Sequence, residues 1–180
     1  MKELLTKKFL GKYKNEKNPL SHIGEFVYLR TYSRYLEDKK RRETWFETVL
    51  RTVEYNIGLG VTYKESHGIT IHWEEERKEA ERLFDNLFYL RTFTSGRTLY
   101  MGGTKIVKEY PLSNYNCCFT EIEKFHDFVD VFYLLMVGCG VGIRIDRELI
   151  KKLPTVHTVS LEGLYNEEIR KNTPKEDMED

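Results

Sequence analysis

Apolar side chains recur at helical spacing in several stretches of the chain. Residues 41–60 carry one such repeat, formed by Trp45, Val49, Val53 and Ile57. A spacing of three or four residues places these side chains on one face of a helix. We expect Gly58 or Gly60 to end this helix in a left-handed cap, because glycine adopts that conformation without steric cost.

A second helical repeat occupies residues 71–93. Glutamates at 74–76 crowd its first turn, where the helix dipole favours negative charge. The apolar face consists of Trp73, Ala80, Leu83, Phe84, Leu87 and Phe88. Upstream, residues 25–38 favour a helix over a strand, and the polar stretch 11–21 predicts a loop after a short N-terminal helix.

The second half of the chain changes from long helical repeats to short segments. Residues 94–104 contain three glycines and predict a loop with little regular structure. The segments that follow predict a strand at 115–122, a helix at 124–137, a strand at 141–146, a short helix at 147–153 and a third strand at 155–164. Residues 165–180 hold too few apolar side chains to pack on themselves.

Composition narrows the class of protein. The 180 residues include 29 basic and 29 acidic side chains, so the formal charge is zero and gives no global attraction to nucleic acid or to an anionic membrane. Three cysteines do not make a secreted disulfide framework. The N-terminus lacks the long apolar segment of a signal peptide, and Asp130 interrupts the longest apolar patch. We therefore expect a cytoplasmic protein with reduced thiols.

Two adjacent cysteines, Cys117 and Cys118, stand in the predicted strand 115–122. Successive strand residues point to opposite faces, so only one of the two thiols can face a given cavity. A disulfide between neighbours would force a strained ring, so a redox partner would have to come from elsewhere in space. A free cysteine is most often a small buried hydrophobe, and the residues alone favour that interpretation.

Metal and dinucleotide sites fit the sequence poorly. Cys117, Cys118, His126 and Cys139 are suitable zinc ligands, but their spacing matches no common zinc pattern. The glycine run 138–142 follows a predicted helix and precedes a strand, which is the reverse of the order in a dinucleotide fingerprint. It remains a glycine loop whose backbone can lie close to a ligand, or a plain tight turn.

Two further stretches carry polar chemistry. Ser95, Thr98 and Thr104, among the glycines of residues 94–104, could hold phosphate through backbone N–H groups, although a surface turn is favoured. The basic stretches RTYSR (residues 30–34) and KKRRE (39–43) would fit a nucleic-acid patch, but their acidic neighbours favour a solvated helical face.

Five segments, taken in order, resemble one known family. They are RTYSRYL (30–36), RRETWFETVLRTVEYNI (41–57), EAERLFDNLFYLRTFTSGRTLYMGGT (79–104), NYNCCF (114–119) and FYLLMVGCGVGIRI (132–145). They resemble the N-terminal part of adenosylcobalamin-dependent ribonucleoside-triphosphate reductase, the monomeric class II ribonucleotide reductase, from about Gly24 to Leu153. The resemblance implies an α+β fold. A mainly helical subdomain (1–93) would precede the first strands of an incomplete α/β barrel (94–153) and a polar, truncated tail (154–180).

The resemblance also implies roles for individual residues. Cys117 would be one of two cysteines that reduce the ribose 2′ position and end as a disulfide, while Cys118 would face the other way, into packing. Asn116 would neighbour the substrate, and Ser95 would lie near its phosphates. Gly140 would belong to a loop that passes close to the nucleotide.

The implied reaction reduces ribonucleoside triphosphates to deoxyribonucleotides. Adenosylcobalamin would generate a thiyl radical, thioredoxin would regenerate the thiols, and a dNTP or ATP would act as effector. The family's radical cysteine, the partner of Cys117 and the cobalamin contacts lie downstream of this sequence. We therefore expect the chain to be inactive alone, either as a truncated fragment or as half of a split enzyme completed by another chain. Direct binding to nucleic acid or membrane is not expected.

Two rival interpretations remain open. The chain could be a non-catalytic interaction or regulatory module derived from a reductase lobe, in which case replacing Cys117 by serine would leave its function intact. It could also be a small zinc-binding nucleic-acid protein, which metal analysis of the purified chain would test.

Overall fold

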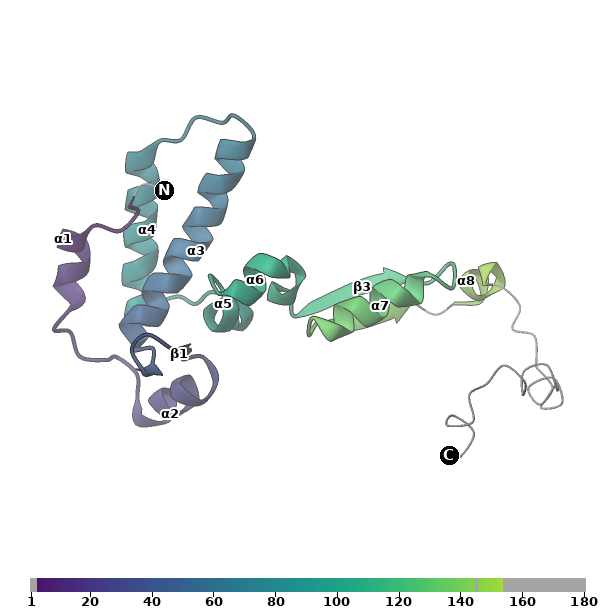
Figure 1. Cartoon of the computed structure of the whole chain (residues 1–180), viewed down its shortest axis with the longest axis horizontal. Coiled ribbons are helices and arrows are strands. Elements are labelled where there is room, and N and C mark those ends of the chain that lie inside the picture. The colour runs from purple at the N-terminus through teal and green to yellow at the C-terminus, as the bar shows by residue number, and fades with distance from the viewer. Residues whose placement is uncertain (1–2, 145, 154–180) are drawn as a thin grey trace.

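The computed structural model describes residues 3–144 and 146–153. Its helices are α1 (Lys7–Leu10), α2 (His22–Thr31), α3 (Trp45–Ser66), α4 (Trp73–Phe88), α5 (Gly96–Met101), α6 (Lys105–Glu109), α7 (Asp127–Met136) and α8 (Arg147–Lys152), with 3₁₀ turns η1 (Gly11–Tyr13) and η2 (Pro111–Asn114). Its strands are β1 (Tyr35–Leu36), β2 (Arg41–Arg42), β3 (Cys117–Glu121) and β4 (Gly140–Arg144). In Figure 1 the helices before β3 gather in one body, from which β3, α7 and β4 extend as an arm. The predicted α+β class is confirmed.

Helices α3 and α4 form the centre of the helical body. They lie side by side and a short loop joins them, as an antiparallel helix pair requires (Figure 1). Their facing sides bury Val49, Val53, Val61, Ala80, Phe84 and Leu87. The predicted helix at 71–93 is confirmed as α4, with four of its expected apolar positions fully buried and Trp73 and Leu83 partly buried.

A capping box fixes the start of α3. The Thr44 hydroxyl accepts a hydrogen bond from the backbone N–H of Glu47 at 3.3 Å, and the Glu47 carboxylate accepts one from the backbone N–H of Thr44 at 2.8 Å. The Arg41 guanidinium, which donates to the same carboxylate, holds the pKa of Glu47 well below its usual range. The first turn of the helix is therefore tied to the hairpin that precedes it.

The end of α3 differs from the prediction. Gly58 and Gly60 do not end the helix, which continues to Ser66. Just past the end of α3, Gly68 has a left-handed backbone, with a φ of 65°. Core packing explains the continuation, because Val61, in the next turn, is only 1% exposed and lies within the core.

The predicted helix at 25–38 is right only as far as Thr31, where α2 ends. The chain then reverses into a small hairpin, in which β1 pairs antiparallel with β2. Tertiary hydrogen bonds impose the reversal: the hydroxyls of Tyr28 and Ser33 both donate to the backbone carbonyl of Glu43, at 3.0 and 2.8 Å. The basic stretch 39–43 therefore lies on the hairpin, and 30–34 leads from α2 into it. Arg30 and residues 39–42 are exposed, so the expected solvation is right, but a single helical face is wrong.

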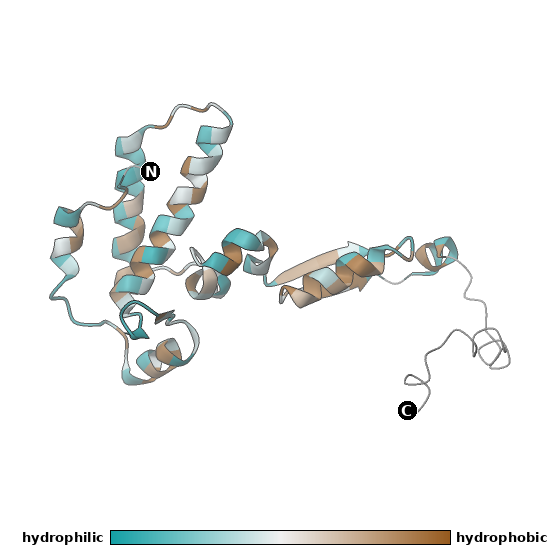
Figure 2. Cartoon of the chain, in the orientation of Figure 1, coloured by the Kyte–Doolittle hydropathy of each residue, from teal (hydrophilic) through white to brown (hydrophobic). Residues whose placement is uncertain are grey.

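The arm is a strand–helix–strand unit, as predicted. Strands β3 and β4 pair in parallel, with Cys117 opposite Gly140 and Phe119 opposite Gly142. Figure 2 shows apolar residues along β3 and α7. The predicted helices at 124–137 and 147–153 are confirmed as α7 and α8. The predicted third strand (155–164) and the tail (154–180) lie outside the described residues.

The expected loop at 94–104 contains a short helix instead, α5. Ser95 explains it, because its hydroxyl caps the first turn. The predicted domain boundary at 93/94 stays a prediction. Within the described ranges, no helix has the length and apolar character needed to span a membrane.

Candidate active site

Ser95 stands at the start of α5. Its hydroxyl oxygen accepts a hydrogen bond from the backbone N–H of Thr98 at 3.1 Å and lies 2.8 Å from the Thr98 hydroxyl. The amide of Asn114 donates to that same hydroxyl at 3.4 Å. This chain of contacts joins the first turn of α5 to the residues just before β3, so α5 and the start of the strand are positioned together.

A cavity of about 760 Å³ opens between α5, the end of α2 and the segment before β3. It is lined by Thr31, Tyr32, Ser95, Gly96, Arg97, Tyr100, Asn114, Tyr115 and Asn116. Two of the residues that the sequence nominated, Ser95 and Asn116, thus line the same cavity. The other two, Cys117 and Gly140, do not line the cavity, but both contact Asn116, which does.

Asn116 connects the cavity to the sheet. Its side-chain amide lies 3.5 Å from Cys117 Sγ, and its backbone carbonyl accepts a hydrogen bond from the Gly140 N–H at 2.8 Å. Cys117 and Gly140 are also direct neighbours in the parallel register. Asn116, Cys117 and Gly140 are therefore linked directly, and Asn116 shares the cavity with Ser95.

The two adjacent thiols have different surroundings. Cys117 is exposed, on the same sheet face as Phe119 and Glu121. Cys118 points to the opposite face, is half-buried and lies 3.8 Å from the carbonyl of Gly140. Burial, followed by the neighbouring thiol of Cys139, raises the pKa of Cys118 and favours its neutral form. Of the adjacent pair, Cys117 is thus the thiol that a ligand can reach.

The thiol of Cys139 is buried against backbone carbonyls. This residue is 3% exposed, and its thiol lies 3.2 Å from the carbonyl of Leu112 and 3.1 Å from that of Tyr115. These contacts anchor the glycine loop to the segment before β3. Within the described parts of the chain, no three histidine, cysteine, aspartate or glutamate side chains gather to hold a metal ion.

Sequence reasoning missed Arg97. Its guanidinium donates to the Gly138 carbonyl at 2.6 Å and to the Asn116 side-chain oxygen at 3.4 Å. Both acceptors are uncharged, so the positive charge of Arg97 stays available to an anion in the cavity. Its acceptors are 41 and 19 residues away in sequence, and only its position two residues after Ser95 could have signalled a role.

A buried ion pair holds α5 against the helical body. Arg51 of α3 binds both carboxylate oxygens of Glu43, at 2.8 and 2.9 Å. The same guanidinium donates to the backbone carbonyls of Gly102 and Leu99, at 2.6 and 3.1 Å. Burial alone would raise the pKa of Glu43, but Arg51, Thr48 and the backbone N–H of Arg34 outweigh it, and the pKa lies below its usual range.

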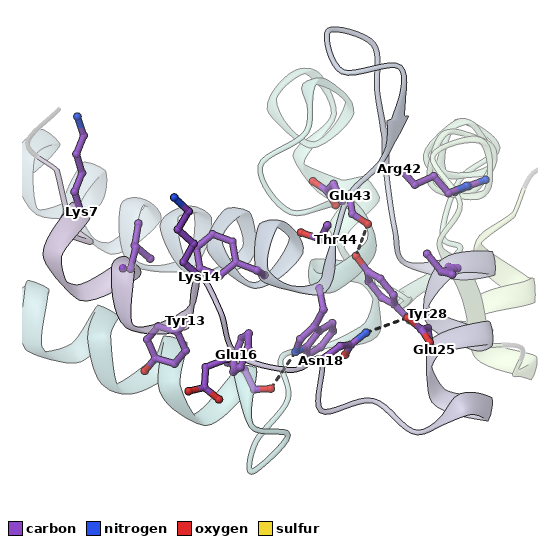
Figure 3. A pocket seen from close by; sticks show the side chains of 16 residues that line it. Lys7, Tyr13, Lys14, Glu16, Asn18, Glu25, Tyr28, Arg42, Glu43 and Thr44 are labelled. Carbon is purple, nitrogen blue, oxygen red and sulfur yellow. Dashed lines mark hydrogen bonds between the residues drawn. The ribbon is translucent and has the colours of Figure 1, made fainter.

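A larger cavity, of about 790 Å³, lies away from the four nominated residues, between η1, α2 and the start of α3 (Figure 3). Figure 3 shows Lys7 and Lys14 along one side, and hydrogen bonds from Tyr28 to the Glu43 carbonyl and from Asn18 to Glu25. None of the four nominated residues lines this cavity. We therefore place the candidate active site at the smaller cavity beside Cys117.

The fold and the site match one class of protein. Residues 5–104 match the model of the ribonucleotide reductase alpha domain, which is more than half of the chain. The chain belongs to the ribonucleotide reductase family. A crystal structure of a B12-dependent (class II) ribonucleotide reductase superposes with a TM-score of 0.73, at 31% identity over 83% of this chain and 24% of that one.

Its curated relatives carry a more specific name. The adenosylcobalamin-dependent ribonucleoside-triphosphate reductase of Lactobacillus leichmannii is 32% identical over 173 residues, which cover 84% of this chain and 23% of the relative. A probable reductase of the same name from Dictyostelium discoideum is 33% identical over 147 residues, 77% of this chain and 19% of the relative. The chain thus spans about a quarter of the length of these relatives, and the resemblance seen in the sequence, to their N-terminal portion, is confirmed.

Proposed function

We propose that this chain forms the substrate-binding and reducing-thiol part of a ribonucleoside-triphosphate reductase. One observation carries the proposal: Cys117 is exposed on a parallel strand, beside a cavity that holds Ser95, Arg97 and Asn116. A thiol that reduces a ribose must lie next to the bound nucleotide and remain free to meet a second thiol. Cys117, exposed beside the cavity, would meet both conditions, whereas Cys118 is half-buried and Cys139 is buried.

The cavity supplies complementary contacts to a nucleotide. The Arg97 guanidinium, hydrogen-bonded only to neutral oxygens, would attract the phosphates, and the backbone at Ser95 and Gly96 would contribute N–H donors. The Asn116 amide lies at the edge of the cavity next to the Cys117 thiol, so a ribose within reach of that thiol would lie beside Asn116. Opposite Cys117, Gly140 carries no side chain and leaves the sheet face open to the sugar.

The net chemistry requires two thiols. One ribonucleotide and two thiols give one deoxyribonucleotide, one disulfide and one water. The bond between ribose C2′ and its oxygen breaks, the oxygen leaves as water, and the two thiols supply two electrons and two protons. Cys117 would provide one thiol, and a cysteine outside the described residues would provide the other.

The remaining components of the reaction are proposed from the relatives. Their names specify adenosylcobalamin, a cofactor whose carbon–cobalt bond breaks to supply a radical. We assign the binding of this cofactor to the part of the relatives that this chain does not cover. An effector nucleotide, the radical cysteine and the docking of thioredoxin are assigned there as well, and the chain would not turn over alone. Chemistry with free thiols favours a reducing compartment such as the cytoplasm.

Helix α7 exposes apolar side chains that another segment of protein could cover. Phe132 and Met136 are 60% and 85% exposed, and Figure 2 shows this part of the arm as apolar. Water-exposed apolar side chains in such a cluster indicate an interaction surface. We propose that further reductase sequence, in the same chain or in a complementing one, packs on α7.

A chimera tests the proposal. This chain would replace the aligned N-terminal segment of the Lactobacillus leichmannii reductase, and conversion of CTP to dCTP would be measured with adenosylcobalamin and thioredoxin. We expect Cys117→Ser to abolish turnover and Cys118→Ser to retain most of it. Equal loss in both variants, or turnover without Cys117, would support the rival view of a non-catalytic module.

A second measurement needs only the chain itself. Alkylation of Cys117 by iodoacetamide should slow in the presence of CTP, because a nucleotide in the cavity covers that thiol, while the rate at Cys118 stays constant. Mass spectrometry of the labelled peptides separates the two sites. Unchanged alkylation of Cys117 at saturating CTP would place the nucleotide elsewhere.

A further inference from the structure

Three arginines line a second cavity, which adjoins the candidate active site. This cavity has a volume of about 520 Å³, and its lining consists of Arg30, Thr31, Ser33, Arg34, Tyr35, Arg42 and Tyr100. Two of these residues, Thr31 and Tyr100, also line the cavity that contains Ser95 and Arg97. The two cavities are therefore neighbours around a shared wall. We refer to the second one as the arginine cavity.

The three guanidinium groups have no acidic partners in the described part of the chain. Arg34 lies over the ring of Tyr100, 4.6 Å from its centroid, and Arg30 lies 5.9 Å from the ring centroid of Phe26. Arg42 donates to the backbone carbonyl of Ser33 at 2.7 Å. Three arginines and no carboxylate line the cavity, so its wall carries a positive charge that no lining residue balances.

The nearest buried carboxylate does not compensate them. Glu43 is 4% exposed, and both of its oxygens are bound by Arg51. The Glu43 carboxylate contacts this region through a hydrogen bond from the backbone N–H of Arg34, which does not involve the Arg34 guanidinium. The mutual repulsion of three arginines favours an anion between them, and arginine suits phosphate because its planar fork presents paired donors.

We propose that the arginine cavity binds the terminal phosphate of a ribonucleoside triphosphate. The inference rests on the proposed function, because it places the ribose beside Asn116 and the first phosphates near Ser95 and Arg97. From there the phosphate chain passes the shared wall at Thr31 and Tyr100 and ends between Arg30, Arg34 and Arg42. These arginines would then distinguish a triphosphate from a diphosphate.

The test compares CTP with CDP. Calorimetric titration of the chain at low salt should give at least tenfold tighter binding of CTP than of CDP. In Arg34→Ala this preference should disappear, with CDP affinity almost unchanged, because only the third phosphate contacts the arginine cavity. Arg82→Ala, an exposed arginine on α4 away from the cavities, removes the same charge and should keep the preference. Arg30→Ala, whose exposed side chain makes no hydrogen bond, provides a second variant if Arg34→Ala fails to fold.

The outcomes separate this inference from the proposed function. Equal binding of CTP and CDP by the wild type, or no measurable binding of either at millimolar concentration, overturns the inference. An equal loss of preference in Arg82→Ala also overturns it, because the effect would then be one of net charge. Asn116→Ala should weaken both nucleotides to the same degree. If it weakens neither while Arg34→Ala still removes the preference, the arginine cavity stands and the proposed ribose position fails.

Discussion

Replacing Glu43 by glutamine should weaken the attachment of α5 to the helical body. Glu43 and Arg51 have side chains that are 4% and 16% exposed, and the pair sits between α3 and the last turn of α5. The substitution leaves the buried Arg51 guanidinium without a counter-charge, although the Gly102 and Leu99 carbonyls still accept from it. A buried charge that loses its counter-charge is strongly destabilising.

The expected magnitude follows from the burial of the pair. Removing one partner of a buried ion pair costs about 3–5 kcal/mol, and glutamine keeps one acceptor, so we expect about 3 kcal/mol. For a domain of this size, each kcal/mol of lost stability lowers the midpoint temperature of thermal unfolding by about 2–4 °C. The substitution should therefore lower this temperature by about 6–12 °C. Urea unfolding at pH 7, followed by far-ultraviolet circular dichroism, measures the free energy directly.

The pH dependence gives a second signature. The folded pKa of Glu43 lies below its unfolded value of about 4.3, so its contribution is complete above that pH and disappears as the pH falls through the folded pKa. The stability gap between wild type and Glu43→Gln should therefore narrow as the pH is lowered from about 5 towards 3. A gap that stays constant over this range would contradict the assigned ionisation of Glu43.

Glu74 provides the matched control. It forms an ion pair with Lys78 at 2.8 Å, but its side chain is 83% exposed. Glu74→Gln should therefore leave the midpoint temperature of unfolding unchanged. Equal effects of the two glutamine substitutions would refute the argument that burial of the Glu43–Arg51 pair holds α5. Because α5 carries Ser95 and Arg97, Glu43→Gln should also weaken CTP binding in the calorimetric assay.

Four further predictions concern single positions. Gly102→Ala should destabilise the chain by about 1–3 kcal/mol in urea unfolding, because the added Cβ would lie 2.5 Å from the Thr98 carbonyl; Gly60→Ala, with open space around it, should stabilise α3 by up to about 1 kcal/mol. Thr44→Ala removes a capping box and should cost about 1 kcal/mol in the same assay. Alkylation of Cys118 by iodoacetamide should be slower at pH 8 than that of a free cysteine and should still be accelerating above pH 9, because its pKa is raised. A destabilising Gly60→Ala, a neutral Thr44→Ala or a plateau for Cys118 below pH 9 would contradict the respective argument.

Elements with a clear period were predictable from the sequence. The apolar face of α4, the α7 repeat and the β3 alternation all matched the structure, because each repeat has the period of the element that forms. The ends of α2 and α3 were not predictable. Contacts that Tyr28 and Ser33 make with Glu43 end the first, and the core position of Val61 extends the second.

The candidate site also contains features that the sequence could predict and features that it could not. Strand alternation was enough to separate the face of Cys117 from that of Cys118. Arg97 escaped notice because its partners are distant in sequence, and no local pattern records which carbonyls a long side chain reaches. The arginine cavity was likewise hidden, since it forms only where the end of α2, the hairpin and α5 meet.

The role of Cys117 is tested most directly by a single turnover without external reductant. The pre-reduced chimera would be mixed with adenosylcobalamin and CTP, quenched, and mapped by mass spectrometry of its disulfide-linked peptides. We predict dCTP formation in step with a disulfide that joins Cys117 to a cysteine outside residues 3–153, with Cys118 and Cys139 still reduced. Formation of dCTP while Cys117 remains a free thiol, or a disulfide at Cys118 instead, would contradict the assignment of Cys117 as the reducing thiol.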